Sequence, residues 1–445
     1  MVKFDKKFIF GVATSSYQIE GAAAEDGRTP SIWDEFCKIP GKVYQGQNGD
    51  VTCDHYHRYK EDVRLMKEIG VDSYSFSIAW SRIFPDYQKY NEKGMEFYKK
   101  LIDELRKNDI EPAVTLYHWD LPLWAYNRGG WLSRDSVKWF QDYATKVFKE
   151  LNASVKIWVS HCEPFCASML GYYFGIHAPG HKNLREALTA AHHILLSHGL
   201  AVESFRDLSF SESNIGIKIN LTPSYPASNS KEDVEASYRS DGLANRWFLD
   251  PVFKSSYPED MKKIYSNLVG ALDFIKDGDL EKISSKIDFL GLNYYTRVLT
   301  KFVQDSKINY QDFPGNLKKT EMGWEICPEV FYDLILRLRK EYTQIPIYIT
   351  ENGAAFDDFL TEEKRIHDTE RIDYVRKHLE KIVELNGQGA DVRGYFLWSL
   401  LDNFEWAYGY SKRFGILYVD YNTQDRIFKD SALWYREVIQ NRAIR

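Results

Sequence analysis

The chain has 445 residues, of which 44% are hydrophobic and 27% are charged. This balance excludes wholesale disorder and provides enough apolar side chains for a large core. The 58 basic and 64 acidic residues give a formal charge of −6. We therefore expect neither nucleic acid nor an anionic membrane as the main partner, because both bind basic surfaces.

The cysteines and the apolar stretches indicate the cellular compartment of the protein. The five cysteines are odd in number and scattered, so we expect no disulfide framework and a reducing compartment. The longest apolar stretches, such as 345–349 and 396–401, are far shorter than the roughly 20 residues of a membrane-spanning helix. Residues 1–10 contain no apolar core of a signal peptide. We expect a cytoplasmic protein.

Aromatic residues make up 15% of the chain, with 30 Tyr, 26 Phe and 12 Trp. Aromatic rings fill protein cores, and they also pack against the apolar face of a pyranose sugar. Composition alone leaves both interpretations open.

Short β-rich apolar segments alternate with long amphipathic helical patterns along the chain. The predicted strands are 8–13, 73–79, 113–117, 157–160, 215–221, 287–292, 347–350 and 394–398. The predicted helices are 59–69, 92–108, 135–151, 184–205, 328–342 and 369–386.

Eight strands that alternate with helices predict an α/β fold, namely a (β/α)₈ TIM barrel. We expect it to form one domain over residues 1–445, with loop insertions at 224–286 and 300–323. A split at residue 225 into two α/β domains is the alternative, although no linker sequence supports it.

Most of the predicted strands end in polar or aromatic clusters. In a barrel the carboxyl ends of the strands converge on one face, where catalytic groups lie. The clusters are 14–21, 117–122, 161–164, 293–295, 351–353 and 399–406.

Glu163 and Glu351 each follow a hydrophobic strand. Two carboxylates across a cleft suit glycoside hydrolysis, in which one protonates the leaving oxygen and the other attacks the anomeric carbon or activates water. Metal binding is the alternative, with His118, His161 and Asp120 as further ligands. No metal-ligand spacing occurs near these residues, so we expect no metal.

Four motifs indicate a family. They are FxxGxATSSYQIEG at 8–21, YHWDLP at 117–122, ITENG at 349–353, and the segment from Trp398 through Trp406. In these motifs the chain resembles glycoside hydrolase family 1, the β-glucosidase family, over nearly its whole length.

The resemblance implies a TIM barrel and a retaining β-glucosidase without a cofactor. It would release terminal non-reducing β-D-glucosyl residues from a small β-glycoside or disaccharide, as in the degradation of cellulose; it does not indicate the oligomeric state. The implied roles are Glu351 as nucleophile and Glu163 as acid/base. Other implied contacts are Gln18, His118, Trp119, Glu405 and Trp406 on sugar hydroxyls, Trp398 under the ring, Tyr295 on the nucleophile, and Trp324 on the leaving group.

The expected substrate is a neutral sugar, because the Glu405 carboxylate would repel a 6-phosphate. Lys412 and Arg413 lie nearby in the sequence and could still contact an anion.

Two positions depart from the family pattern. Ser75 stands where the family has Arg beside the nucleophile, and Cys162 stands where the family has Asn on the sugar 2-hydroxyl. We therefore expect Glu351 to lack an adjacent cation, and a space to exist beside C2. Water, a neighbouring side chain or a C2 substituent of the substrate could fill that space. The alternatives to an ordinary β-glucosidase are a carbohydrate-binding pseudoenzyme and an enzyme with altered C2-side specificity.

Overall fold

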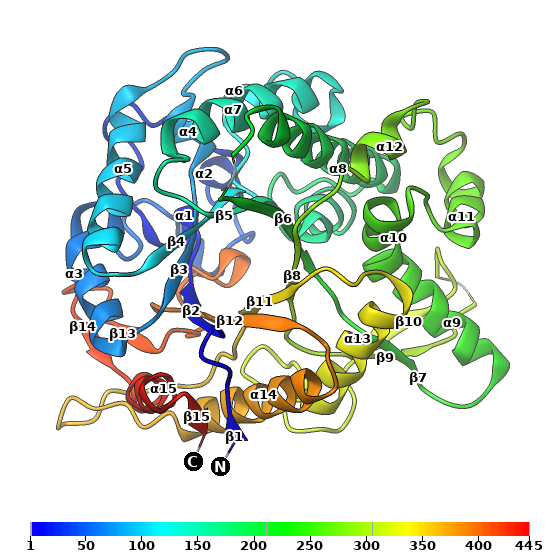
Figure 1. Cartoon of the computed structure of the whole chain (residues 1–445). Coiled ribbons are helices and arrows are strands. Elements are labelled where there is room, and N and C mark those ends of the chain that lie inside the picture. The colour runs from blue at the N-terminus through cyan, green and yellow to red at the C-terminus, as the bar shows by residue number, and fades with distance from the viewer. Residues whose placement is uncertain (1, 211, 305, 445) are drawn as a thin grey trace.

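The computed structural model describes residues 2–210, 212–304 and 306–444. Within them a closed parallel barrel has the order β11-β12-β2-β3-β4-β5-β6-β8, seen at the centre of Figure 1. All eight predicted strands are confirmed as members of this barrel. They are β2 (Ile9–Ala13), β3 (Ser73–Ser77), β4 (Glu111–Tyr117), β5 (Ile157–Cys162), β6 (Asn214–Asn220), β8 (Phe289–Asn293), β11 (Ile347–Asn352) and β12 (Val392–Trp398).

The alternative split at residue 225 is wrong. Strand β6 lies before that point and β8 lies after it, yet the two pair in parallel, with Gly216 opposite Phe289 and Asn220 opposite Asn293. A barrel needs every strand to close, so the two halves of the chain share one sheet.

The predicted helices surround the barrel in Figure 1. Their apolar stripes face the strands; on α5, for example, Tyr98, Leu101, Ile102 and Leu105 are buried at helical spacing. The helices that match the six predicted ones are α3 (His55–Ile69), α5 (Glu92–Lys107), α7 (Asp135–Leu151), α8 (Leu184–Asp207), α13 (Pro328–Glu341) and α14 (Thr369–Gly387).

The two predicted insertions lie between barrel strands, and they contain regular structure that the sequence did not predict. The first insertion is largely helical, because aromatic residues such as Trp247, Phe248 and Tyr265 are buried there. The second contributes strands to a small sheet of order β10-β9-β7. The elements are β7 (Ser224–Pro226), α9 (Lys231–Asp241), η4 (Gly242–Arg246), α10 (Trp247–Lys254), α11 (Glu259–Val269), α12 (Asp279–Ile283), β9 (Val298–Lys301) and β10 (Gln311–Phe313).

The two ends of the chain meet beneath the barrel, where β1 (Val2–Lys3) pairs with β15 (Ala443–Ile444) (Figure 1). No helix in the described ranges is long and apolar enough to cross a membrane. The remaining elements are α1 (Ser16–Ile19), α2 (Ile32–Phe36), η1 (Tyr44–Gly46), α4 (Trp80–Ile83), α6 (Leu123–Tyr126), η2 (Gly130–Leu132), η3 (Cys166–Tyr173), η5 (Trp406–Tyr408), β13 (Leu417–Val419), β14 (Arg426–Phe428) and α15 (Asp430–Asn441).

Candidate active site

A cavity of about 600 Å³ opens at the carboxyl ends of the barrel strands. Glu163 directly follows β5 and Glu351 lies near the end of β11, and both carboxylates line this cavity. The predicted site residues that line it are His118, Trp119, Glu163, Tyr295, Trp324, Glu351, Trp398, Glu405 and Trp406. Those that lie outside the lining are Gln18, Ser75 and Cys162.

Glu351 is buried among groups that favour its ionised form. Tyr295 Oη donates to Glu351 Oε2 at 2.9 Å, and Cys162 Sγ donates to Oε1 at 3.4 Å. Lys218 Nζ lies 3.8 Å from the same Oε1. Burial raises the pKa of Glu351 above its ordinary value, and the Lys218 charge and the two donors oppose that rise.

Glu163 has surroundings that raise its pKa toward neutral pH. Asn293 Nδ2 donates to Glu163 Oε1 at 2.8 Å, and Cys166 Sγ donates to Oε2 at 2.9 Å. Burial and the negative charge of Glu351 nevertheless raise the pKa of Glu163 to about 7. Glu351 has a cation within ion-pair distance, which suits a nucleophile, and Glu163 has a pKa raised to about 7, which suits an acid/base.

The backbone at Glu163 is held in an unusual conformation. Its φ of 50° lies in the left-handed region, which costs a non-glycine residue about 1–3 kcal/mol. The Glu163 N–H donates to the backbone oxygen of Lys218 at 2.9 Å, which fixes this turn after β5. Strand β6 therefore positions the Glu163 backbone, and its Lys218 side chain approaches Glu351.

The expectation that Glu351 lacks an adjacent cation is wrong, because Lys218 supplies one. Lys218 lies in the middle of β6, is 1% exposed, and donates from Nζ to Ser75 Oγ at 3.0 Å. The sequence signal was a single lysine in the otherwise apolar core of a predicted barrel strand. Sequence reasoning also missed Asn293 and Cys166, which bind Glu163.

The side chain of Lys218 lies where the sequence predicts a space, next to Ser75. Its ammonium contacts the small Ser75 side chain, and neither Ser75, Cys162 nor Lys218 lines the cavity. A neighbouring side chain, that of Lys218, therefore lies in the space predicted beside Ser75.

The loop after β12 carries Glu405 and Trp406. Gln18 Nε2 donates to the Phe404 backbone oxygen at 2.9 Å and lies 3.5 Å from Glu405 Oε2, so Gln18 supports this loop from below the cavity surface. Burial, together with the charges of Glu351 and Glu163, raises the pKa of Glu405 to about 8.

Aromatic rings form a wall of the cavity. The ring centroids of Trp119 and Trp406 lie 4.6 Å apart, and His118 stacks near both Trp398 and Trp406 at 6.0 Å. Burial and the Lys218 charge hold the pKa of His118 well below its usual range, so its imidazole is neutral and offers one donor and one acceptor. Flat apolar faces beside such polar groups suit a sugar ring.

The two basic residues that could contact a 6-phosphate are engaged elsewhere. Lys412 Nζ donates to the Glu321 backbone oxygen at 2.7 Å, and Arg413 Nη1 donates to Asp402 Oδ2 at 2.6 Å. Neither residue lines the cavity. Neither Lys412 nor Arg413 is therefore placed to bind a 6-phosphate in this cavity.

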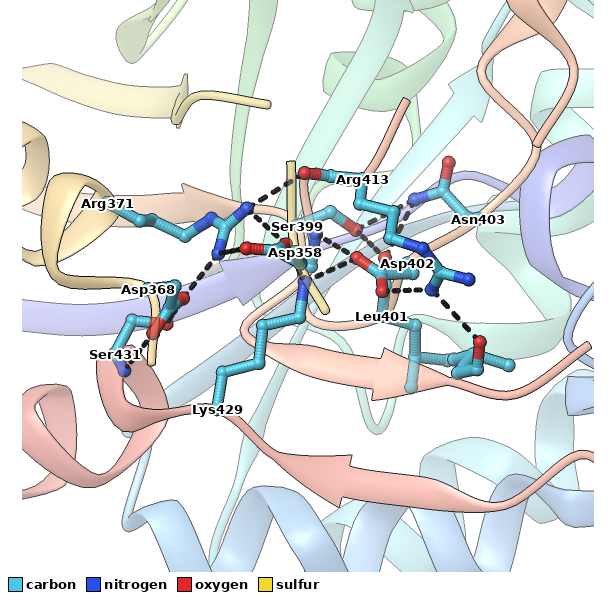
Figure 2. A network of polar contacts seen from close by, with 12 residues as sticks. Asp358, Asp368, Arg371, Ser399, Leu401, Asp402, Asn403, Arg413, Lys429 and Ser431 are labelled. Atoms are coloured by element: carbon cyan, nitrogen blue, oxygen red, sulfur yellow. Dashed lines mark hydrogen bonds and ion pairs between the residues drawn. The ribbon is translucent and has the colours of Figure 1, made fainter. Parts of the chain in front are cut away.

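A network of six charged side chains joins the loops that follow β11 and β12 (Figure 2). Lys429 Nζ donates to Asp402 Oδ1 at 2.7 Å and to Asp358 Oδ2 at 2.6 Å, which joins the loop after β12 to the loop after β11. Three cations balance three carboxylates there, as a buried cluster requires. The members are Asp358, Asp368, Arg371, Asp402, Arg413 and Lys429.

One group of possible metal ligands occurs in this region. Ligand atoms of His118, Cys162 and Glu351 lie within 4.8 Å of one another. His161 and Asp120, considered from the sequence, are not in this group. The ammonium of Lys218, 3.8 Å from the same carboxylate oxygen, repels a second cation. These residues therefore fit a resident metal poorly.

Known proteins resemble the chain over its whole length. The sequence model described as Glycosyl hydrolase family 1 matches residues 1–444. Beta-glucosidase A of Acetivibrio thermocellus is 49% identical, with 99% of each chain covered. The crystal structure of the GH1 beta-glucosidase from Exiguobacterium antarcticum B7 is 56% identical, with a TM-score of 0.98 and 99% of each chain covered. The Thermotoga maritima beta-glucosidase in complex with deoxynojirimycin is 43% identical, with a TM-score of 0.96 and 100% of each chain covered.

Proposed function

The chain belongs to glycosyl hydrolase family 1 and is a glycoside hydrolase, and from this premise we propose that it is a retaining β-glucosidase. Its substrates are small β-glucosides and disaccharides, from which it releases the terminal non-reducing β-D-glucosyl residue. The observation that carries the proposal is the pair Glu163 and Glu351, which share one cavity in electrostatically different surroundings.

In the first step the Glu351 carboxylate attacks the anomeric carbon while Glu163 gives its proton to the glycosidic oxygen. The bond from the anomeric carbon to that oxygen breaks, and the sugar is left as an ester on Glu351. In the second step Glu163 takes a proton from water, the water attacks the anomeric carbon, and the ester bond to Glu351 breaks. Two inversions restore the β configuration.

The donors around Glu351 explain the division of labour. Lys218, Tyr295 and Cys162 favour its carboxylate, as a nucleophile requires. The charge on Glu351 in turn favours the protonated form of Glu163, as a general acid requires. When the ester forms, this charge disappears, and the pKa of Glu163 falls, which suits its second role as a base.

The sugar is proposed to bind between the aromatic wall and the loop after β12, with Trp398 under the ring. His118, Trp119, Glu405 and Trp406 would bind its hydroxyls, Gln18 would do so or support Glu405, and Trp324 would contact the leaving group. The beta-glucosidase names of the relatives, and the deoxynojirimycin complex of one of them, support this proposal.

A binding protein without turnover is not favoured. Both carboxylates are present, and the cation that Ser75 had seemed to remove is supplied by Lys218. We further propose that the enzyme works in the cytoplasm on disaccharides from cellulose. Its five cysteines are free and buried, which suits a reducing compartment.

The direct test follows the anomeric configuration of glucose by NMR during hydrolysis of an aryl β-glucoside and of cellobiose. We expect β-glucose as the first product. A 2-deoxy-2-fluoro-glucoside with a good leaving group should label Glu351, as read by peptide mass spectrometry. First release of α-glucose, or labelling of another residue, would contradict the proposal.

A further inference from the structure

We propose that Lys218 is a positioning residue for catalysis, which holds the nucleophile Glu351 as a carboxylate with a cation delivered from β6 instead of β3. This inference rests on the proposed function and deepens it, because it assigns a role to a residue outside the four motifs. It also explains how the site accommodates Ser75.

The lysine crosses the interior of the barrel to reach its place. Three strand-to-strand steps separate β6 from β3 in the barrel order, and two steps separate β6 from β11. Lys218 Nζ nevertheless lies 3.0 Å from Ser75 Oγ on β3 and 3.8 Å from Glu351 Oε1 on β11. Its ammonium therefore lies between two strands to which its backbone is not paired.

Small side chains make this crossing possible. The register neighbours of Ser75 are Ala13 on β2 and Ala113 on β4, so the β3 wall leaves room for a long side chain from the opposite wall. The register neighbour of Lys218 on β5 is Cys162, which donates to the same Glu351 oxygen. The two departures from the family pattern and Lys218 therefore form one local cluster around the nucleophile.

The burial of Lys218 argues against a purely structural role. A buried ammonium is costly unless it is paired and hydrogen-bonded. Among the residues that the structure describes, Glu351 is the one carboxylate within ion-pair distance of Lys218, and Ser75 is its one side-chain hydrogen-bond partner. Within the described ranges its one ion-pair partner is therefore the nucleophile, on which its charge acts.

Ser75 has a defined part in this arrangement. Its hydroxyl accepts from the ammonium and keeps it near β3, within reach of Glu351. An arginine at position 75 would occupy the same volume. Serine at 75 and lysine at 218 are therefore complementary choices.

Other titratable groups face Lys218 and Glu351 and can contribute to a pH profile of the reaction. They are Cys162 and Glu163 from β5, Cys166 from η3, His118 after β4, Tyr295 after β8 and Glu405 after β12. Burial raises the pKa of both cysteines and of Tyr295 well above their ordinary values and lowers that of His118, so these four stay neutral on the acidic side. Burial and neighbouring carboxylates raise the pKa of Glu163 to about 7 and that of Glu405 to about 8; both groups are unchanged in every variant below, so a difference between variants reports on Lys218.

The experiment measures the rate of inactivation by a 2-deoxy-2-fluoro-glucoside against pH. This reaction reports the attack by Glu351 without the second step. Lys218→Met removes the charge at nearly constant length, and Lys218→Gln removes the charge but can still bond Ser75. Lys218→Arg keeps the charge. Lys156→Met makes the same change in net charge just before β5, at the opposite end of the barrel, and is the matched control.

Loss of an adjacent cation typically raises the pKa of a carboxyl by about 1–3 units. In Lys218→Met and Lys218→Gln we expect the acidic limb of the inactivation rate to move to higher pH by that amount. In Lys218→Arg and Lys156→Met we expect this limb to stay in place. If Lys218→Met does not fold, Lys218→Gln decides the matter. If neither neutral variant folds, the double variant Lys218→Thr with Ser75→Arg decides, because its arginine supplies the cation from β3. The acidic limb of its inactivation rate must then lie at the same pH as in the wild type.

The outcomes separate this inference from the proposed function. If the wild-type enzyme is not labelled at all, the proposed function fails. If the wild type is labelled and the neutral variants keep its acidic limb, the inference about Lys218 is wrong while the proposed function stands. A shifted limb in the combined variant also overturns the inference.

Discussion

Placing the family's arginine at position 75 is expected to damage this enzyme instead of improving it. The place is already occupied, because Lys218 Nζ lies 3.0 Å from Ser75 Oγ. In Ser75→Arg two cations would meet in the barrel interior with one nearby carboxylate, Glu351. The change also inserts a long side chain into a packed wall next to Ala13 and Ala113.

The size of the effect follows from the charges. Two unit charges about 4 Å apart repel by about 4 kcal/mol at the effective dielectric typical of proteins. Overpacking adds typically about 1–3 kcal/mol, and attraction of the arginine to Glu351 offsets a part of the sum. We expect the free energy of unfolding to fall by about 4 kcal/mol, out of the roughly 5–15 kcal/mol of a typical protein.

The assay is urea unfolding followed by tryptophan fluorescence, with kcat/KM on an aryl β-glucoside measured in parallel. A double-mutant cycle compares the wild type, Ser75→Arg, Lys218→Thr and the double variant. We expect the double variant to be more stable, by about 2–3 kcal/mol in the free energy of unfolding, than the sum of the two single changes predicts, because the two changes occupy one site. A tenfold rise of kcat/KM in Ser75→Arg without loss of stability would refute the reasoning.

Three further predictions test other parts of the site. Glu351→Ala should abolish turnover, and added azide should restore it with an inverted glycosyl azide as the product. Glu163→Ala should still hydrolyse substrates whose leaving groups need no proton. A glycosyl azide with retained configuration from Glu351→Ala would reverse the assignment. The kcat/KM profile should fall as pH rises through about 7, because Glu163, whose pKa is raised to about 7, then loses the proton it must give; a flat profile up to pH 9 would contradict this. Asp402→Asn should lower the free energy of unfolding by about 3–5 kcal/mol, because Lys429 and Arg413 then lose a buried partner; urea unfolding measures it, and a change below about 1 kcal/mol would show that the network adds little.

The sequence predicted the barrel well because its signal is local. Each strand is a short apolar segment between helices, and all eight were found with ends displaced by only a few residues. The insertions were predicted from the absence of a barrel strand, but the helices and strands inside them were not. Buried aromatic residues of the first insertion, such as Trp247, belong to these helices.

The candidate site was predictable where residues come from strand ends. The convergence of those ends placed Glu163 and Glu351 in one cavity. Lys218 was not predictable in this way, because its ammonium reaches Glu351 two strands away and Ser75 three strands away from its own strand. Strand periodicity tells which face a side chain occupies, but it does not tell how far a long side chain reaches across the barrel. Asn293 lies in a strand-end cluster that the sequence places on this face, but its contact with Glu163 spans two strands and could not be predicted. The contact of Cys166 with Glu163 is local, at a separation of three residues, but no motif indicated it.

The six-charge network has a consequence for how the molecule opens. Asp402 Oδ1 also accepts from the Gly415 N–H at 2.9 Å, so the network ties down both ends of the loop that carries Glu405. Local opening of this loop would separate Asp402 from Lys429 and leave the buried Lys429 with Asp358 as its remaining carboxylate partner, which is costly. We therefore expect the loop to stay closed until the barrel itself unfolds, so that on heating activity follows the folded population.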